Sequence, residues 1–155
     1  MSEVTHQQAD LLLKLYDLRR EPRLRQARAW YVEKFTPVSS PEEFMTKYPP
    51  GGEESTHLRM VTSYWEMAAS LVNRGLIDDE LFFENTGEPW VVWEKAKPLI
   101  PAWREMFKSP GMMANLEKLA ARMEAYWEKR GPGSVEVRRE FFRRMAQPAA
   151  KAAGE

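Results

Sequence analysis

The sequence predicts an all-α fold, a single-domain helical bundle of about five to seven helices. Long stretches repeat apolar residues at alternating spacings of three and four, which places them on one face of a helix. Prolines and glycines separate these stretches from one another. The one stretch with strand-like alternation, residues 134–138, is too short to argue for a sheet.

Length and composition fit one packed domain. The chain has 155 residues, 43% of them hydrophobic, and a domain of this size buries roughly 70% of the surface of its unfolded chain. The absence of cysteine excludes disulfides, thiolate catalysis and sulfur ligands for metals. The 23 basic and 23 acidic side chains cancel, so no overall charge attracts nucleic acid or an anionic membrane. The apolar run at residues 11–13 is too short for a signal peptide or a membrane span. We therefore expect a cytoplasmic protein with no transmembrane segment.

The first two helices are predicted on either side of an arginine-rich junction. Residues 4–19 carry leucines at helical spacing: Leu11, Leu12, Leu15 and Leu18. Pro22 suits the first turn of the second helix, which we expect to bury Trp30, Tyr31 and Phe35. The junction holds a cluster of basic residues, with Asp17 and Glu21 among them: Arg19, Arg20, Arg23, Arg25 and Arg28.

A short helix and a long helix follow. Residues 40–43, Ser-Pro-Glu-Glu, form a capping box with proline at the first helical position. Residues 48–52, Tyr-Pro-Pro-Gly-Gly, then end the short helix. From about residue 53 to residue 74 the 3-4-3-4 spacing predicts one buried face, made of Leu58, Val61, Trp65, Ala68 and Val72. Gly75 stands where a left-handed C-terminal cap belongs.

Two further helices lead to a predicted break in the chain. Asp78 can cap a short helix that contains Phe82 and ends near Gly87, and Pro89 opens the next helix. Proline in a helix interior breaks or kinks the helix. Pro98 and Pro101 therefore predict a break or sharp kink near Lys97, with both prolines in the first turn of a new helix.

The last long helix is predicted to start at residues 109–110, Ser-Pro, and to close at residues 131–133, Gly-Pro-Gly. Its apolar spacing repeats through Met113, Leu116, Ala120, Met123 and Trp127. Residues 135–145 form a short final helix, and residues 147–155 are expected to fray. We therefore divide the chain into a helical domain, residues 1–131, and a basic amphipathic C-terminal segment with a frayed tail, residues 132–155.

Both histidines lie three residues after a glutamate, as Glu3 with His6 and Glu54 with His57. Di-iron bundles use two such pairs, because positions i and i+3 project from one helix face into a shared site. Three more glutamates could complete such a site: Glu66, Glu94 and Glu124. The alternative interpretation is a surface or capping histidine, because the first pair is near the terminus and the second is beside a loop. Our prediction for this sequence is no metal site and no cofactor. Glu54 and His57 are the residues that we name as candidate ligands for the alternative, a metal site.

The tryptophans allow two interpretations. Besides Trp30, five of them form a possible aromatic stripe: Trp65, Trp90, Trp93, Trp103 and Trp127. At helical spacing such residues usually pack in the core, where each indole N–H needs a partner. The alternative is a hydrophobic cavity or a groove for a partner.

The C-terminal segment supplies the candidate partner-binding residues: Arg138, Arg139, Phe141, Phe142, Arg143 and Arg144. A basic amphipathic helix of this kind can bind an acidic protein groove, an anionic membrane surface or nucleic-acid phosphates. The alternative is that the phenylalanines fold back onto the domain and the arginines are solvated. The balanced net charge argues against nucleic acid.

The middle of the chain carries a series of sequence features in order: Tyr64-Trp65-Glu66, Gly75-Leu76-Ile77-Asp78-Asp79-Glu80-Leu81, Trp93, Lys97-Pro98-Leu99-Ile100 and Arg104. Over residues 55–128 this order resembles a bacterial family of uncharacterised helical domains. Many members of that family carry an N-terminal membrane segment, which this sequence lacks. The resemblance implies a helical fold and supplies no activity or catalytic residue.

No phosphate-binding loop, dinucleotide fingerprint or nucleophile elbow occurs in the sequence. The sequence therefore predicts a non-enzymatic interaction or adaptor domain, which binds a protein partner through an aromatic surface or through the basic C-terminal segment. The alternatives are a metal-dependent enzyme of the di-iron bundle type and a binder of a small apolar ligand. Assembly into a homo-oligomer stays open.

Overall fold

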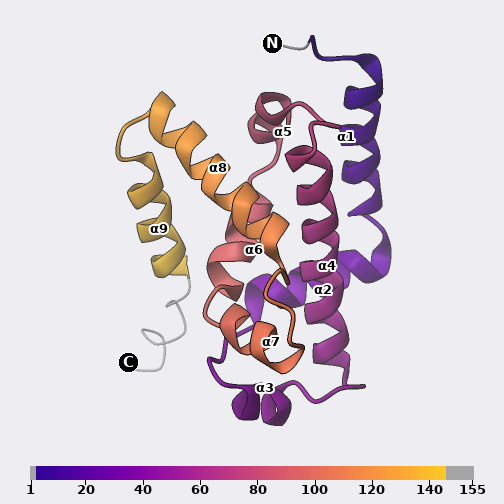
Figure 1. Ribbon diagram of the computed structural model, residues 1–155, viewed down its shortest axis with the longest axis vertical. Helices are drawn as coiled ribbons and strands as arrows, with labels where there is room; N and C mark the ends of the chain where they lie inside the picture. Colours follow the sequence, from indigo (N-terminus) through magenta and orange to yellow (C-terminus); the bar gives the residue numbers. More distant parts are fainter. Residues whose placement is uncertain (1–2, 146–155) are drawn as a thin grey trace, which may run out of the picture. The chain divides into compact units, whose positions relative to one another are not determined.

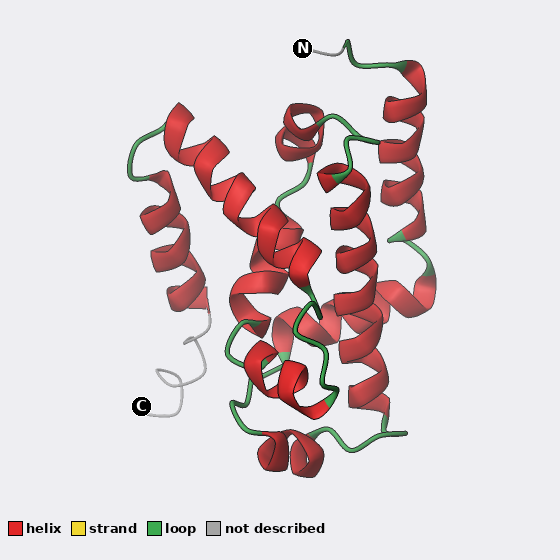
Figure 2. Cartoon of the chain, viewed as in Figure 1, coloured by secondary structure: helices red, strands yellow, loops and turns green. Residues whose placement is uncertain are grey.

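The computed structural model describes residues 3–145, and every regular element in this range is a helix (Figures 1 and 2). The helices in this range are α1 (His6–Leu18), α2 (Pro22–Glu33), α3 (Pro41–Lys47), α4 (Glu53–Asn73), α5 (Asp79–Asn85), α6 (Glu88–Ala96), α7 (Ile100–Met106), α8 (Ala114–Arg130) and α9 (Ser134–Met145). The predicted all-α class is confirmed, and the expected number of five to seven helices was too low. Three of the observed helices, α3, α5 and α7, are only seven residues long. Within residues 3–145 no helix combines the length and the apolar character needed to cross a membrane.

The chain divides into two compact units, Met1–Ala120 and Ala121–Glu155. The predicted boundary between residues 131 and 132 falls inside the second unit, in the turn between α8 and α9, and it stays a prediction. In the described part of the second unit, α9 folds back along the end of α8 (Figure 1). The tail for which we expected fraying, residues 147–155, lies outside the described residues.

Helix α4 is the centre of the first unit, where it packs against α2, α5 and α6. Its predicted apolar face is confirmed, because all five pattern residues are buried. Fully burying one large apolar side chain stabilises a fold by roughly 1.5–3 kcal/mol. The helix ends as predicted at Gly75, whose φ of +77° is left-handed. There Leu76 donates to the carbonyl of Leu71 and Gly75 donates to that of Val72, at 3.0 Å each, which is a Schellman cap.

Local capping signals also hold for the short helices. The Ser40 hydroxyl accepts from the Glu43 N–H at 3.1 Å, and the Asp78 carboxylate accepts from the Leu81 N–H at 2.9 Å. The predicted break at Lys97 is confirmed, because α6 ends at Ala96 and α7 begins at Ile100.

The placement of the two prolines at this break was only half right. Pro101 lies in the first turn of α7, as predicted. Pro98 instead lies in the turn before that helix, where Leu99 donates to the Ala96 carbonyl at 2.8 Å. Proline is tolerated in such a turn because no hydrogen bond needs its missing N–H.

The predicted start of α8 at residues 109–110 was wrong, because the helix begins at Ala114. Residues 109–113 form turns instead, and Met113 has a left-handed φ of +61°. The cap comes from α4, where the Glu66 carboxylate accepts from Asn115 N and Nδ2 at 3.1 Å each and from Leu116 N at 2.7 Å. A carboxylate at a helix N-terminus satisfies free N–H groups and interacts favourably with the helix dipole.

Candidate functional site

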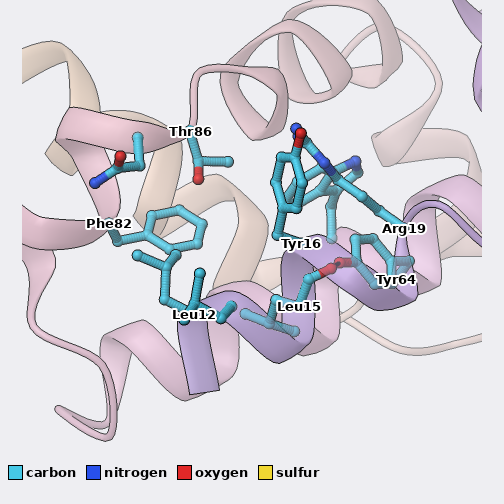
Figure 3. A pocket seen from close by; sticks show the side chains of 10 residues that line it. Leu12, Leu15, Tyr16, Arg19, Tyr64, Phe82 and Thr86 are labelled. Carbon is cyan, nitrogen blue, oxygen red and sulfur yellow. Dashed lines mark hydrogen bonds between the residues drawn. The ribbon is translucent and has the colours of Figure 1, made fainter. Parts of the chain in front are cut away.

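A cavity of about 250 Å³ opens between α1, α4 and α5 in the first unit (Figure 3). Its apolar wall consists of Leu12, Leu13 and Leu15 from α1, Trp65 from α4 and Phe82 from α5. Its polar lining consists of Tyr16, Arg19, Tyr64, Asn85 and Thr86. Because Leu13 and Tyr16 are exposed, the cavity is open to solvent along α1. An engineered apolar cavity of about 150 Å³ already binds benzene, so this one has room for a small ligand.

The side chain of Tyr64 attaches α1 to α4 at the inner wall of the cavity. Its hydroxyl donates a hydrogen bond to the carbonyl of Leu15, and both residues are buried. Burial raises the pKa of Tyr64 to about 12, although the positive charges of Arg19 and Arg28 lower it in part. Tyr64 therefore stays neutral at physiological pH and acts as a hydrogen-bond donor.

Behind the cavity, four helices bring polar side chains to one carboxylate, that of Glu88 at the start of α6. Arg28 of α2 binds it with both prongs of its guanidinium: Nε donates to Oε1 at 2.7 Å, and Nη2 donates to Oε2. Trp65 of α4 donates its indole N–H to Oε1 at 3.3 Å. Arg19, at the end of α1, has its Nη1 3.9 Å from Oε2. All three charged side chains are about four-fifths buried, at 19–21% exposure.

Arg28 contacts the Glu88 carboxylate more closely than Arg19 does. Two-pronged pairing of arginine with a carboxylate is the strong form of this interaction, and the hydrogen bond to Glu88 raises the pKa of Arg28. The 3.9 Å separation between Arg19 and Glu88 exceeds hydrogen-bond length. The guanidinium of Arg19 lies instead 4.4 Å from the centre of the Tyr16 ring, at the edge of the cavity. Two cations thus share one anion, which leaves the cluster with one excess positive charge.

The lining lacks the side chains that most often act as general acids and bases near neutral pH. None of the ten residues that line the cavity is a histidine or a carboxylic acid. The guanidinium of Arg19 stays protonated, and the pKa of Tyr64 is far above neutrality. The arrangement therefore supports the binding of a ligand.

The tryptophans divide as the two interpretations of the sequence anticipated. Trp65, Trp90, Trp103 and Trp127 are buried, and Trp93 is partly buried. Among them Trp65 lines the cavity. The other lining residues belong to the α1, α4 and α5 segments, and the sequence analysis did not group them as a site. The feature of the sequence that could have indicated this cavity is the arginine cluster at the first helix junction, which contains Arg19.

The metal candidates do not assemble into a site. His57 has its Nε2 3.5 Å from a carboxylate oxygen of Glu53, and its ring centre is 5.8 Å from that of Trp30. Glu54 is exposed. In residues 3–145 no three histidine, aspartate or glutamate side chains come close enough to hold a metal ion. The three further glutamates each contact another group. The Glu66 carboxylate caps α8. A carboxylate oxygen of Glu94 lies 3.0 Å from the Lys97 Nζ, and the Glu124 carboxylate pairs with the Arg139 guanidinium. The di-iron alternative therefore draws no support from the structure.

The six C-terminal candidates divide into three that contact α8 or are partly buried and three that are exposed. Arg139 pairs with Glu124 of α8 at 2.5 Å, the Arg138 guanidinium lies 4.0 Å from the Trp127 ring, and Phe142 is partly buried. The other three, Phe141, Arg143 and Arg144, are exposed.

On the outward face of α9, Phe141 joins two residues that sequence reasoning did not select. Val137, Phe141 and Met145 follow one another at intervals of four positions. They are 69%, 66% and 63% exposed, respectively. They form an apolar stripe along one side of the helix. Glu140 flanks this stripe and lies 3.4 Å from Arg143 and 3.7 Å from Arg144.

Comparison with known proteins places most of the chain in one family. A family model described as a domain of unknown function (DUF4760) matches residues 4–123. The resemblance over residues 55–128 to a family of uncharacterised domains is thus confirmed. The match begins further towards the N-terminus, at residue 4, and it includes every residue that lines the cavity. Neither the curated proteins nor the solved structures gave a match.

Proposed function

The chain belongs to the DUF4760 family of domains of unknown function, and from its own geometry we propose that it binds a small, largely apolar ligand in the cavity between α1, α4 and α5. The observation that carries the proposal is the lining itself, a continuous apolar wall from three helices. Such concave, mostly apolar sites are the usual form of small-molecule sites in proteins.

The volume of the cavity limits the size of the ligand. Water occupies about 30 Å³ per molecule, so about 250 Å³ corresponds to roughly eight non-hydrogen atoms. Each methylene group removed from water contributes about 0.8 kcal/mol, and six of them contribute about 5 kcal/mol. Binding on this basis corresponds to a Kd on the order of 0.1–1 mM.

The indole N–H of Trp65 offers a direct test, because Trp65 forms one wall of the cavity. In a ¹⁵N-labelled sample, 1-octanol is expected to shift the Trp65 indole signal, assigned with Trp65→Phe, and to raise the melting temperature. The signal of Trp103, which does not line the cavity, is the internal control. If octanol near its solubility limit moves neither the Trp65 signal nor the melting temperature, the proposal fails.

A second candidate function is protein–protein interaction through α9, and the exposed stripe of Val137, Phe141 and Met145 favours it. The stripe itself indicates the partner, because an antiparallel second copy of α9 covers the same apolar residues on both chains. The helix also carries both signs of charge, Glu136 and Glu140 beside four arginines, so each copy offers acids to the bases of the other. We therefore propose self-association of this chain along the stripe.

The stripe is short, and a stable interface usually buries about 800 Å² on each partner, so this self-association should be weak. Sedimentation velocity is expected to show concentration-dependent dimerisation that Phe141→Glu abolishes. Phe107→Glu, at an equally exposed phenylalanine of the first unit, is the matched control and should leave it unchanged. A wild-type chain that stays monomeric at millimolar concentration would exclude this candidate.

A further inference from the structure

The charged end of the cavity is built differently from its apolar wall. Arg28 occupies both oxygens of Glu88, and Trp65 donates to one of them. The guanidinium of Arg19 is therefore left with no hydrogen bond from its side chain within residues 3–145, and its shortest ionic contact there is the 3.9 Å separation from Glu88.

The surroundings of Arg19 add positive charge to this end of the cavity. Tyr16 lies between two guanidiniums, with Arg19 4.4 Å and Arg20 5.9 Å from the centre of its ring. The carboxylate of Glu21, the nearest acid after this pair in the chain, accepts from the Leu24 N–H at 2.9 Å as the cap of α2. Asp17 is exposed on α1 and does not line the cavity.

The geometry points to an anionic amphiphile as the ligand, a carboxylate of about eight carbons in all with an apolar tail. This inference rests on the proposed function, and it adds the identity of the head group. The tail lies along the wall formed by Leu12, Leu15, Trp65 and Phe82, and the carboxylate pairs with the guanidinium of Arg19 at the open end. The planar fork of arginine matches the two oxygens of a carboxylate, whereas a neutral hydroxyl offers it one acceptor.

Three probes with eight carbons each and different heads test this inference on the wild-type chain: octanoate, 1-octanol and octylammonium. Binding is followed through the Trp65 indole signal at pH 7.5, where the carboxylate is ionised. We expect octanoate to bind about 10- to 100-fold more tightly than octanol, as for a hydrogen-bonded ion pair. Octylammonium should bind more weakly than octanol, because its charge has the same sign as those of Arg19 and Arg20.

Arg19→Gln is expected to remove the preference for octanoate, so that octanoate binds no more tightly than octanol does to the same variant. A shift of the Trp65 indole signal with octanol reports that the cavity of the variant remains folded. Arg23→Gln, at an exposed arginine of α2, is the matched control and should retain the preference for octanoate.

The outcomes separate the head-group inference from the proposed function. Equal binding of octanoate and octanol would overturn the inference and leave the apolar cavity as a binding site. A preference for octanoate that persists in Arg19→Gln would also overturn it, because the anion would then sit elsewhere. If none of the three probes moves the Trp65 signal, the proposed function itself fails.

Discussion

Replacing Glu66 by glutamine should weaken the start of α8, because the carboxylate of Glu66 is the cap of that helix. The carboxylate accepts three hydrogen bonds, two at Oε1 from Asn115 and one at Oε2 from Leu116. Glutamine has one acceptor oxygen, and its amide nitrogen would face an N–H donor at the other position. At least one hydrogen bond is therefore lost in either orientation of the amide.

The magnitude follows from the bonds and the charge that are removed. A hydrogen bond to a charged group contributes about 1.5–3 kcal/mol, and a negative charge at a helix N-terminus contributes about 0.3–1 kcal/mol. We expect Glu66→Gln to lower the free energy of unfolding by about 2–3 kcal/mol. For a chain of this length that corresponds to a melting temperature roughly 4–10 °C lower.

Two measurements test this expectation, one global and one local. Urea unfolding followed by circular dichroism gives the change in stability, with Glu84→Gln as the control at an exposed glutamate of α5. Amide hydrogen exchange at Leu116 gives the local effect and should become faster in Glu66→Gln only. If Glu66→Gln and Glu84→Gln have the same stability and Leu116 exchanges at the wild-type rate, Glu66 is not the cap of α8.

Three further predictions concern other parts of the first unit. Gly75→Ala should cost about 1–2 kcal/mol of stability in urea, because φ at this position is +77°, whereas Gly111→Ala, at a glycine of the first unit with no positive φ and with open space around it, should be nearly neutral. Ser40→Ala should cost about 1 kcal/mol through the lost cap of α3, and an unchanged urea midpoint would contradict that role. Burial raises the pKa of Tyr64 from 10.0 to about 12, so its contribution to stability is complete below pH 10 and is lost as the pH rises towards 12. Tyr64→Phe should therefore show a smaller loss of stability over that interval in pH-dependent thermal melts, although it starts from a lower stability without the hydrogen bond to Leu15.

Features of the fold that depend on neighbouring residues were predictable from the sequence. The apolar face of α4, the left-handed Gly75 and the caps at Ser40 and Asp78 each depend on residues within one or two helical turns. The start of α8 was not predictable in this way, because its cap is Glu66, which is 49 and 50 positions away in the chain from the residues that it holds. Ser109-Pro110 carried a local start signal, and the distant carboxylate determined where the helix begins.

The candidate site was less predictable than the fold for the same reason. Its wall comes from α1, α4 and α5, and periodicity shows which residues of one helix share a face without showing which helices meet. Arg19 and Arg28 stood out as members of a basic cluster. Their common partner Glu88 lies 60 positions beyond Arg28, so the sequence alone could not separate these two arginines from their solvated neighbours.

The convergence of α1, α2, α4 and α6 on Glu88 makes the three charged positions unequal in how freely they can change during evolution. If either arginine is replaced, the carboxylate still has the other within reach. If Glu88 is replaced, the Arg28 guanidinium and the Trp65 indole N–H lose their common acceptor, and Arg19 loses its nearest anion. We therefore expect that a lineage that has lost the acid at position 88 has also lost at least one of the two bases at positions 19 and 28.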